Sequence, residues 1–172
     1  YWIDTGALTI SLHEQWTTVS SELLLRRNEG LAASKGAPLV LDGEDMALVE
    51  LCLDGVRLEP SRYEVGESSL TVTGDLPDTF RLRTVVTIHP ETNTALEGLY
   101  VSNGMFSTQC EAEGFRRITY YLDRPDVMAI FTTTIEAERA RFPLLLSNGN
   151  LLKAEDAGDG RHRATWHDPF KK

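Results

Sequence analysis

Hydrophobic and polar side chains alternate along much of this chain. Residues 8–12 read Leu-Thr-Ile-Ser-Leu, and after a polar interruption at His13-Glu14-Gln15 a second alternating run extends to Leu25. Alternation with a period of two places successive side chains on opposite faces of a sheet. The pattern predicts a hairpin over these residues and a mostly β fold for the whole chain.

Three turn dipeptides predict further hairpins. Asp54-Gly55 lies between two short apolar runs, and Asn103-Gly104 lies between residues 99–101 and 105–107. Asp, Asn and Gly tolerate the positive φ angles that a two-residue hairpin turn requires. We expect Asn148-Gly149 to act in the same way after Leu144-Leu145-Leu146.

A longer strand is predicted from Phe80 to Ile88, with Arg81 and Arg83 on the face toward water. It should stop at His89-Pro90, because proline cannot donate to a β-ladder. A short helix is predicted only at residues 126–131, and residues 132–136 return to β-branched strand chemistry. We therefore expect an all-β fold with little helix, in which two sheets pack face to face.

Composition indicates one folded, soluble domain over residues 1–172. The chain of 19.2 kDa has 41% hydrophobic and 25% charged residues and a mean hydropathy of -0.24, which are ordinary values for globular proteins. Its net charge of -9 disfavours nucleic acid and anionic membrane surfaces as partners. No apolar stretch is long enough to span a membrane, and no export signal opens the sequence, so we expect a cytoplasmic protein.

Few residues indicate chemistry of their own. His13-Glu14 begins like a zinc-binding H-E-x-x-H motif, but position 17 is Thr, and the flanking alternation predicts an exposed loop. The other histidines lack metal-ligand spacing. Cys52 and Cys110 are interpreted as reduced, packed thiols, although a disulfide between them remains open at this point. We predict no catalytic residue and no metal site in this chain.

Ionisable and aromatic residues are concentrated between Thr108 and Asp126, directly after a predicted hairpin strand. In one interpretation, Glu111 and Glu113 offset Arg116 and Arg117 on a solvated edge, where ion pairs contribute little. Residue chemistry alone favours that interpretation, because an acidic protein exposes many carboxylates.

The same segment resembles a signature of the bacterial branch of aminopeptidase N. The resemblance is carried by residues 108–116 (TQCEAEGFR) and 120–126 (YYLDRPD). Residues 93–100, 145–150 and 166–170 resemble further blocks of the same N-terminal domain, in the same order. Several motifs in one order are more specific than a single short pattern.

The resemblance implies a saddle-shaped, largely antiparallel β-domain that leans on a thermolysin-like catalytic domain. It implies that Glu111 binds the free α-amino group of a peptide and that Gln109 adds a polar contact. On extended backbone these two side chains should share a face, with Cys110 pointing away. The neighbouring Glu113, Arg116, Arg117, Asp123 and Asp126 are expected to order the loops behind the pocket.

By resemblance, the parent protein is a zinc-dependent aminopeptidase that removes N-terminal residues from peptides. The zinc ligands and catalytic groups would belong to its own catalytic domain outside these residues, so we predict that this chain alone holds no zinc and cleaves nothing. Its partners would be a peptide with a free N-terminus and that catalytic domain. The alternative is a stand-alone, non-catalytic β-sandwich that serves as a binding or interaction module.

Overall fold

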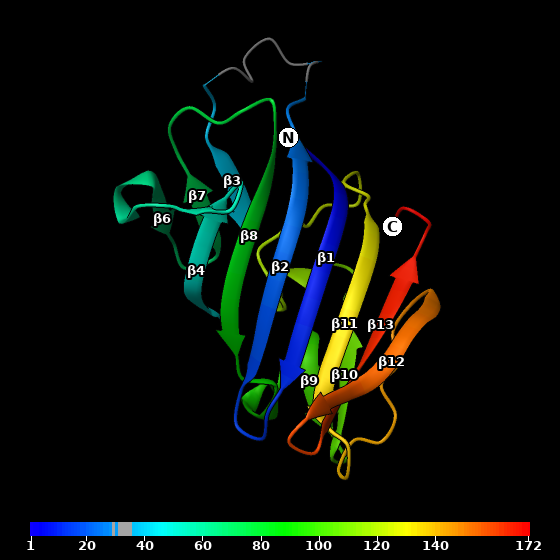
Figure 1. The fold of residues 1–172 in the computed structure, drawn as a ribbon. Coiled ribbons are helices and arrows are strands. Elements are labelled where there is room, and N and C mark those ends of the chain that lie inside the picture. The colour runs from blue at the N-terminus through cyan, green and yellow to red at the C-terminus, as the bar shows by residue number, and fades with distance from the viewer. Residues whose placement is uncertain (29, 31–35) are drawn as a thin grey trace.

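Three sheets make up the computed structural model, which describes residues 1–28, 30 and 36–172. The largest has eight strands in the order β12-β13-β11-β1-β2-β8-β4-β5 (Figure 1). A three-stranded sheet has the order β3-β7-β6, and β9 pairs with β10 as a separate hairpin. All neighbouring strands are antiparallel except β1 and β11, which run parallel.

The strands of the large sheet are β1 (Trp2–Leu12), β2 (Thr17–Arg26), β4 (Ala47–Leu53), β5 (Val56–Arg57), β8 (Thr79–Ile88), β11 (Ile130–Glu138), β12 (Asn150–Gly158) and β13 (Arg161–Asp168). Those of the smaller sheets are β3 (Leu39–Asp42), β6 (Tyr63–Val65), β7 (Ser69–Val72), β9 (Gly98–Ser102) and β10 (Met105–Gln109). In the described residues, helical structure is limited to three-residue 3₁₀ turns: η2 (Pro60–Arg62), η3 (Pro90–Thr92) and η4 (Phe115–Arg117).

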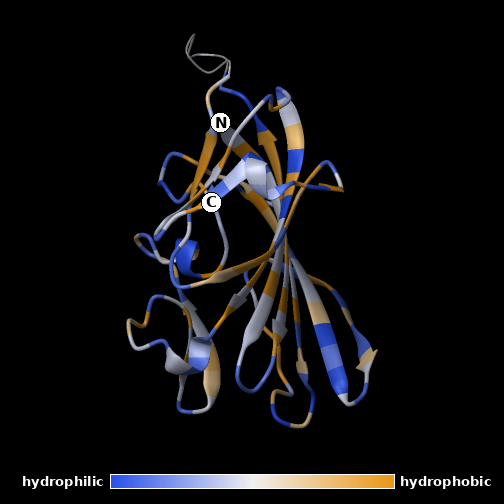
Figure 2. Cartoon of the chain, turned by 90° about the vertical axis from the view of Figure 1, so that its left-hand side faces the viewer, coloured by the Kyte–Doolittle hydropathy of each residue, from blue (hydrophilic) through white to orange (hydrophobic). Residues whose placement is uncertain are grey.

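The core lies between the large sheet and the three-stranded sheet. Leu41 of β3 and Leu70 of β7 are fully buried and belong to the same apolar cluster as Leu25 of β2 and Leu82 of β8. In Figure 2, hydrophobic segments run along the strands near the two labelled termini. The expected all-β fold, with two sheets packed face to face and little helix, is confirmed.

Most predicted strands and turns are confirmed. The first hairpin is β1–β2, and Asp54-Gly55 and Asn103-Gly104 join β4 to β5 and β9 to β10 with positive φ at all four residues. In β8 every second side chain from Phe80 is buried, while Arg81 lies on the solvent side. The strand ends before Pro90, as predicted.

The helix predicted at residues 126–131 is wrong. One hydrogen bond, from the Val127 N–H to the Arg124 carbonyl, closes a single turn there. The chain then extends, because Ala129 exchanges two backbone hydrogen bonds with Lys172 before β11 begins at Ile130. The strand predicted at residues 132–136 lies within β11.

The hairpin predicted at Asn148-Gly149 is also wrong. Leu144–Leu146 form no strand, because the Leu145 carbonyl accepts a hydrogen bond from the Trp166 indole instead of a ladder partner. Gly149 passes so close to β13 that a Cβ there would lie 2.2 Å from the His167 carbonyl oxygen. The hairpin in this region joins β12 to β13 through Asp159-Gly160, a dipeptide of the same kind.

No helix in the described part of the chain is long and apolar enough to cross a membrane.

Candidate functional site

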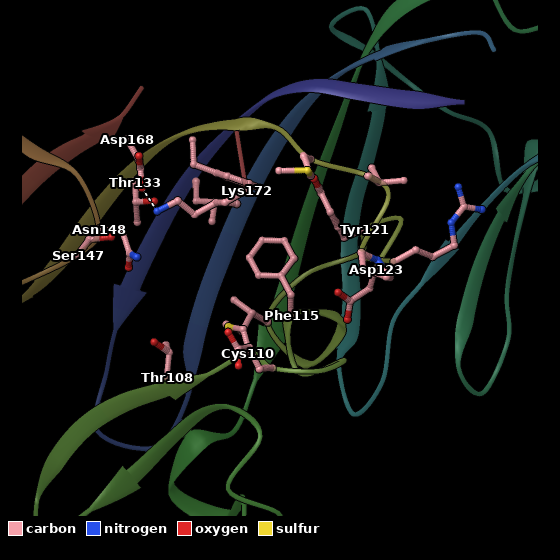
Figure 3. A pocket seen from close by; sticks show the side chains of 18 of the residues that line it. Thr108, Cys110, Phe115, Tyr121, Asp123, Thr133, Ser147, Asn148, Asp168 and Lys172 are labelled. Carbon is pink, nitrogen blue, oxygen red and sulfur yellow. Dashed lines mark ion pairs between the residues drawn. The ribbon is translucent and has the colours of Figure 1, made fainter. Parts of the chain in front are cut away.

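The segment between β10 and β11, residues 110–129, is called the site loop below. It covers one wall of a cavity of about 570 Å³ whose floor is formed by strands of the large sheet (Figure 3). Much of the lining is apolar, and it also includes the carboxylates of Glu111, Asp123 and Asp168 and the cations of Arg124 and Lys172. The apolar lining residues are Leu8, Ile10, Phe115, Ile118, Val127, Met128 and Phe131.

An aromatic cluster anchors the site loop to the sheet beneath it. The ring of Phe115 makes edge contacts with Tyr121 at 4.9 Å and with Phe131 of β11 at 5.6 Å, measured between centroids. Edge-to-face pairs at such distances add to the stabilisation from apolar burial. Burial, followed by the charge of Asp123, raises the pKa of the Tyr121 hydroxyl. Within the described ranges of the chain, that hydroxyl has no hydrogen-bond partner.

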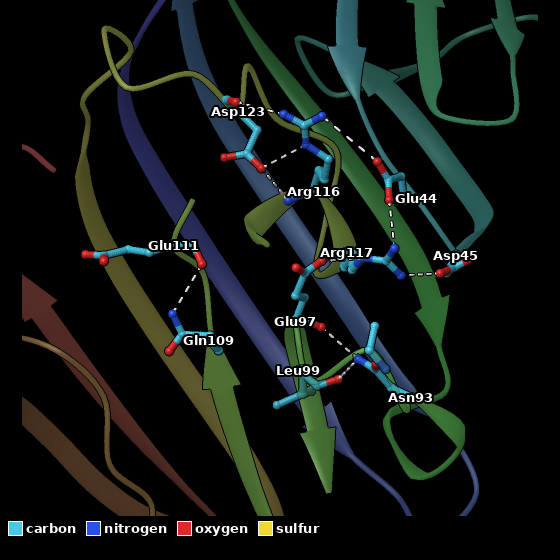
Figure 4. A network of polar contacts seen from close by, with 11 residues as sticks. Glu44, Asp45, Asn93, Glu97, Leu99, Gln109, Glu111, Arg116, Arg117 and Asp123 are labelled. Atoms are coloured by element: carbon cyan, nitrogen blue, oxygen red, sulfur yellow. Dashed lines mark hydrogen bonds and ion pairs between the residues drawn. The ribbon is translucent and has the colours of Figure 1, made fainter. Parts of the chain in front are cut away.

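Glu111 lies at the rim of the cavity with its side chain exposed. Among the described residues, no cationic group lies within ion-pair distance of its carboxylate, and Figure 4 shows the side chain directed away from the nearby arginines. The Gln109 amide donates a 3.3 Å hydrogen bond to the backbone carbonyl of Glu111. The two predicted site residues therefore lie together.

The expected arrangement of side chains around Cys110 is wrong. Cys110 lines the cavity beside Thr108 and Glu111, whereas Gln109 is exposed and is not among the lining residues. Strict alternation fails because β10 ends at Gln109 and the chain turns over residues 111–114, closed by a hydrogen bond from the Gly114 N–H to the Cys110 carbonyl.

Both cysteines are free thiols, as predicted. Burial, together with the negative charge of Asp123, raises the pKa of Cys110 to about 11. Since the thiolate is the reactive form, this thiol is a poor nucleophile near neutral pH. Cys110 therefore contributes shape to the cavity wall.

Arg116 is held by Asp123. Its backbone N–H and its Nε donate to Asp123 Oδ2 at 3.0 and 3.1 Å, and its Nη2 donates to the Asp123 carbonyl at 3.0 Å. The side chains of Arg116 and Asp123 are only 16% and 11% exposed. Burial opposes the charged form of Arg116, but its hydrogen bond to Asp123 and the surrounding carboxylates leave its pKa raised.

Arg117 joins the site loop to two other segments. Its guanidinium pairs with Glu44 at 3.0 Å, with Asp45, and with Glu97 at 3.5 Å (Figure 4). Glu44 and Asp45 follow β3, and Glu97 precedes β9. Arg117 therefore connects three segments that are far apart in sequence.

These contacts support each of the two interpretations of the acidic segment in part. Glu113 pairs with Arg116 at 3.4 Å, as the solvated-edge interpretation expects, but Glu111 pairs with neither arginine. Glu113, Arg116, Arg117 and Asp123 form the ion pairs that their expected role in ordering the loop requires, while Asp126 makes an exposed pair with Arg124.

The histidines occupy separate, satisfied positions. His13 lies in the β1–β2 loop, stacked on Trp16 at 5.1 Å, and its pKa is lowered by burial and then by the charge of Arg161. His162 contacts the Phe142 carbonyl at 2.7 Å, and His167 contacts the Thr132 hydroxyl at 3.0 Å. In the part of the chain that the structure describes, no three His, Cys, Asp or Glu side chains gather as metal ligands.

Sequence reasoning missed the pair formed by Asp168 and Lys172 at the cavity rim. Asp168 is buried, and its carboxylate forms an ion pair with the Lys172 ammonium (Figure 3). The motif at residues 166–170 drew attention to this segment, but an i,i+4 spacing predicts a contact only on a helix, and residues 169–172 are not helical, so no local signal could have identified the pair.

Comparisons with known proteins find relatives that align along the whole chain. Residues 39–172 match the family described as the Peptidase M1 N-terminal domain. The chain is 49% identical over 170 residues to aminopeptidase N of Caulobacter vibrioides and 45% identical over 172 residues to aminopeptidase N of Escherichia coli. These alignments cover 99% and 100% of the chain but 19% of each relative, so the chain spans about a fifth of their length.

Solved structures give the same result for the fold. The structure of Legionella pneumophila aminopeptidase A in complex with aspartic acid superposes with a TM-score of 0.93 at 33% identity. It covers 99% of this chain and 20% of the Legionella chain. An M1 zinc metallopeptidase from Deinococcus radiodurans, bound to a Tyr-Ser-Ala substrate, has a TM-score of 0.79 at 18% identity over 96% of this chain and 38% of its own, a similarity of fold alone.

Proposed function

The chain belongs to the Peptidase M1 N-terminal domain family, and from this premise we propose that it is the substrate-anchoring domain of a longer zinc-dependent aminopeptidase. In this proposal Glu111 binds the α-amino group of a peptide, and the parent protein removes the N-terminal residue. The observation that carries the proposal is the carboxylate of Glu111, which stands at a cavity rim with no cationic partner in the described residues.

An unpaired carboxylate beside an apolar cavity favours a protonated amine as its ligand. Hydrogen bonds between two ionised groups are shorter and stronger than neutral ones, and partial exclusion of water strengthens them further. The Gln109 amide nitrogen donates to the Glu111 backbone carbonyl, so the side-chain carbonyl oxygen of Gln109 remains available as an acceptor. Gln109 would therefore orient the amine that Glu111 attracts.

This recognition makes the parent protein an exopeptidase. Only the first residue of a peptide carries a free α-amino group, so the ammonium sets which peptide bond is placed for cleavage. An internal segment offers no ammonium and would leave the carboxylate unpaired in a closed cleft, which costs free energy.

The described residues do not form a zinc site, since no three ligand side chains gather among them. We propose that zinc is held elsewhere in the parent protein, where it would polarise the scissile carbonyl and activate water. This chain alone would then hold no zinc and cleave no aminoacyl substrate. Stoichiometric zinc in the purified chain, together with such cleavage, would contradict this part of the proposal.

The alternative of a stand-alone binding module has less support, because the relatives from Caulobacter vibrioides and Escherichia coli, which match 99% and 100% of the chain, are longer aminopeptidase N proteins. The two readings differ in what the gene encodes after Lys172. A zinc-binding H-E-x-x-H motif supports the aminopeptidase, whereas an immediate stop codon supports the module.

The test of the anchoring role is Glu111→Ala in the full-length protein, assayed on a free-amine peptide and on its N-acetylated form. We expect the transition-state stabilisation of the free amine, calculated from kcat/KM, to fall by about 2 to 4 kcal/mol, as for the breaking of a buried charge pair. The weak activity on the acetylated peptide should hardly change. Glu67→Ala, at an exposed glutamate outside the cavity, is the matched control. Unchanged activity of Glu111→Ala on the free amine would remove Glu111 from the site.

A further inference from the structure

Two arginines follow Glu111 closely in the sequence, yet neither pairs with it. Arg116 and Arg117 lie five and six residues after Glu111 in the same loop. An arginine paired with Glu111 would compete directly with a ligand ammonium for the same carboxylate. The structure must therefore engage both guanidinium groups elsewhere if Glu111 is to bind an amine.

Five carboxylates form ion pairs with these two guanidinium groups. Arg116 contacts Asp123, Glu113 and, at 4.0 Å, Glu44. Glu44 also pairs with Arg117, whose other partners are Asp45 and Glu97. Two positive groups thus face five negative ones, and each guanidinium has three carboxylate partners within 4.0 Å.

Asp123 is the partner of Arg116 that has least freedom to move. Its backbone N–H donates a 3.0 Å hydrogen bond to Asp42 Oδ2, at the end of β3. Asp42 and Tyr121 exchange backbone hydrogen bonds of 2.7 and 3.1 Å, so the segment before Asp123 is fixed to the three-stranded sheet. Arg116 is therefore held by a side chain that is itself anchored to the fold.

Asp123 also shares the cavity with Glu111. Both residues line it, and Asp123 is close enough to Cys110 for its charge to act on that thiol. If Asp123 lost its charge, Arg116 would keep only Glu44 at 4.0 Å and the exposed Glu113 at 3.4 Å, so its positive charge beside the cavity would be compensated less well. Arg116 would then repel a cationic ligand more strongly, because Asp123 no longer balances its charge.

We propose that Asp123 is a positioning residue for amine recognition, which holds and neutralises Arg116 so that the Glu111 carboxylate remains free for a ligand ammonium. The proposal rests on the amine-binding role given above to Glu111. Asp123 acts through Arg116 and needs no contact with the ligand.

The test is Asp123→Asn in the full-length protein, with steady-state kinetics on a free-amine peptide. Asparagine keeps the size of the side chain and removes its charge. We expect KM to rise about tenfold with little change in kcat, since about 1.4 kcal/mol of ammonium binding is lost. The rise in KM should shrink at high salt, because screening weakens the repulsion from Arg116.

A second substitution separates electrostatic positioning from general damage to the loop. In Asp123→Asn/Arg116→Gln the uncompensated cation is gone, so KM should return most of the way to the unmodified value. A double variant as weak as Asp123→Asn alone would overturn the proposal. The matched control is Asp156→Asn, the same change at an exposed pair with Arg139 outside the cavity lining, which should leave KM unchanged.

Glu111→Gln in the same assay distinguishes failure of this proposal from failure of the function on which it rests. If Glu111→Gln leaves KM for the free amine unchanged, the anchoring role itself is wrong. If Glu111→Gln raises KM while Asp123→Asn behaves like Asp156→Asn, only the role of Asp123 is overturned. Should Asp123→Asn fail to fold, Glu113→Gln removes a more exposed partner of Arg116 and should raise KM in the same direction; an unchanged KM would then overturn the proposal.

Discussion

The large sheet and the site loop differ in the exposure and pairing of their charged side chains. In the sheet, ion pairs such as Arg81–Glu22 stand on the solvent side with side chains 57% and 42% exposed, above an apolar core. In the site loop the Arg116–Asp123 pair is mostly buried, and the exposed carboxylate of Glu111 has no ion-pair partner among the residues that the structure describes. The sheet is thus stabilised by apolar burial that many sequences could supply. The site loop depends on specific partners and keeps one charge available for a ligand.

The largest effect should come from a substitution in the core of the sheet. Leu82 of β8 is fully buried between the two sheets. Leu82→Ala should lower the free energy of unfolding by about 3 kcal/mol, through lost apolar burial and the cavity left behind. Chemical denaturation measures the change. Val56→Ala, at an exposed position, serves as control, and a loss no larger than that of the control would contradict the account of the core.

A smaller loss is expected where the site loop is fixed to β3. Asp42→Ala removes the acceptor for the Asp123 N–H and should cost about 1 to 2 kcal/mol, the penalty for a partly buried donor without a partner. Hydrogen exchange of the Asp123 amide should become faster, while amides in the middle of β2 keep their protection. Asp75→Ala, at an exposed residue, is the control. An unchanged exchange rate at Asp123 would mean that Asp42 does not hold the loop.

A still smaller loss should follow from breaking an ion pair on the sheet surface. Glu22→Gln removes the partner of Arg81, yet the free energy of unfolding should change by less than about 0.5 kcal/mol, because water screens the exposed pair. The same denaturation experiment measures it. A loss as large as that for Asp42→Ala would erase the contrast between the two regions.

The pKa of Cys110 gives a comparison within the site loop itself. Because its pKa is about 11 in the folded protein, alkylation of Cys110 should be slow at pH 8 and should accelerate as the pH approaches 11. Unfolding lowers the thiol pKa toward its ordinary value, so denaturant should speed the reaction at pH 8. Mass spectrometry of the labelled peptide, with Cys110→Ser as control, follows it. Rapid labelling of the folded protein at pH 8 would show that the thiol is not buried.

The sheet could be predicted from the sequence because its rules are local. Alternation located β1, β2 and β8, and Asp54-Gly55 and Asn103-Gly104 located two turns. The same turn chemistry failed at Asn148-Gly149, where Gly149 is needed for a close approach to β13 and forms no hairpin. The local sequence does not reveal which distant segment packs closely against a glycine.

The site loop was harder to predict because its geometry depends on distant partners. The resemblance directed attention to Glu111 and Gln109, but alternation placed Cys110 on the wrong side, since the strand ends at Gln109. The hold of Asp42 on Asp123 joins residues 81 positions apart, and no local pattern predicts it. The charged residues of the loop were visible in the sequence, whereas the choice of partner that leaves Glu111 free required the structure.

The most direct test of the central claim is a crystal structure of the full-length protein with a free amino acid in its active site. The account predicts the α-amino nitrogen at hydrogen-bond distance, about 2.7 to 2.9 Å, from the Glu111 carboxylate, with Arg116 still on Asp123. An amino acid whose ammonium lies beyond ion-pair reach of Glu111, about 4 Å, or a Glu111 paired with Arg116, would contradict it.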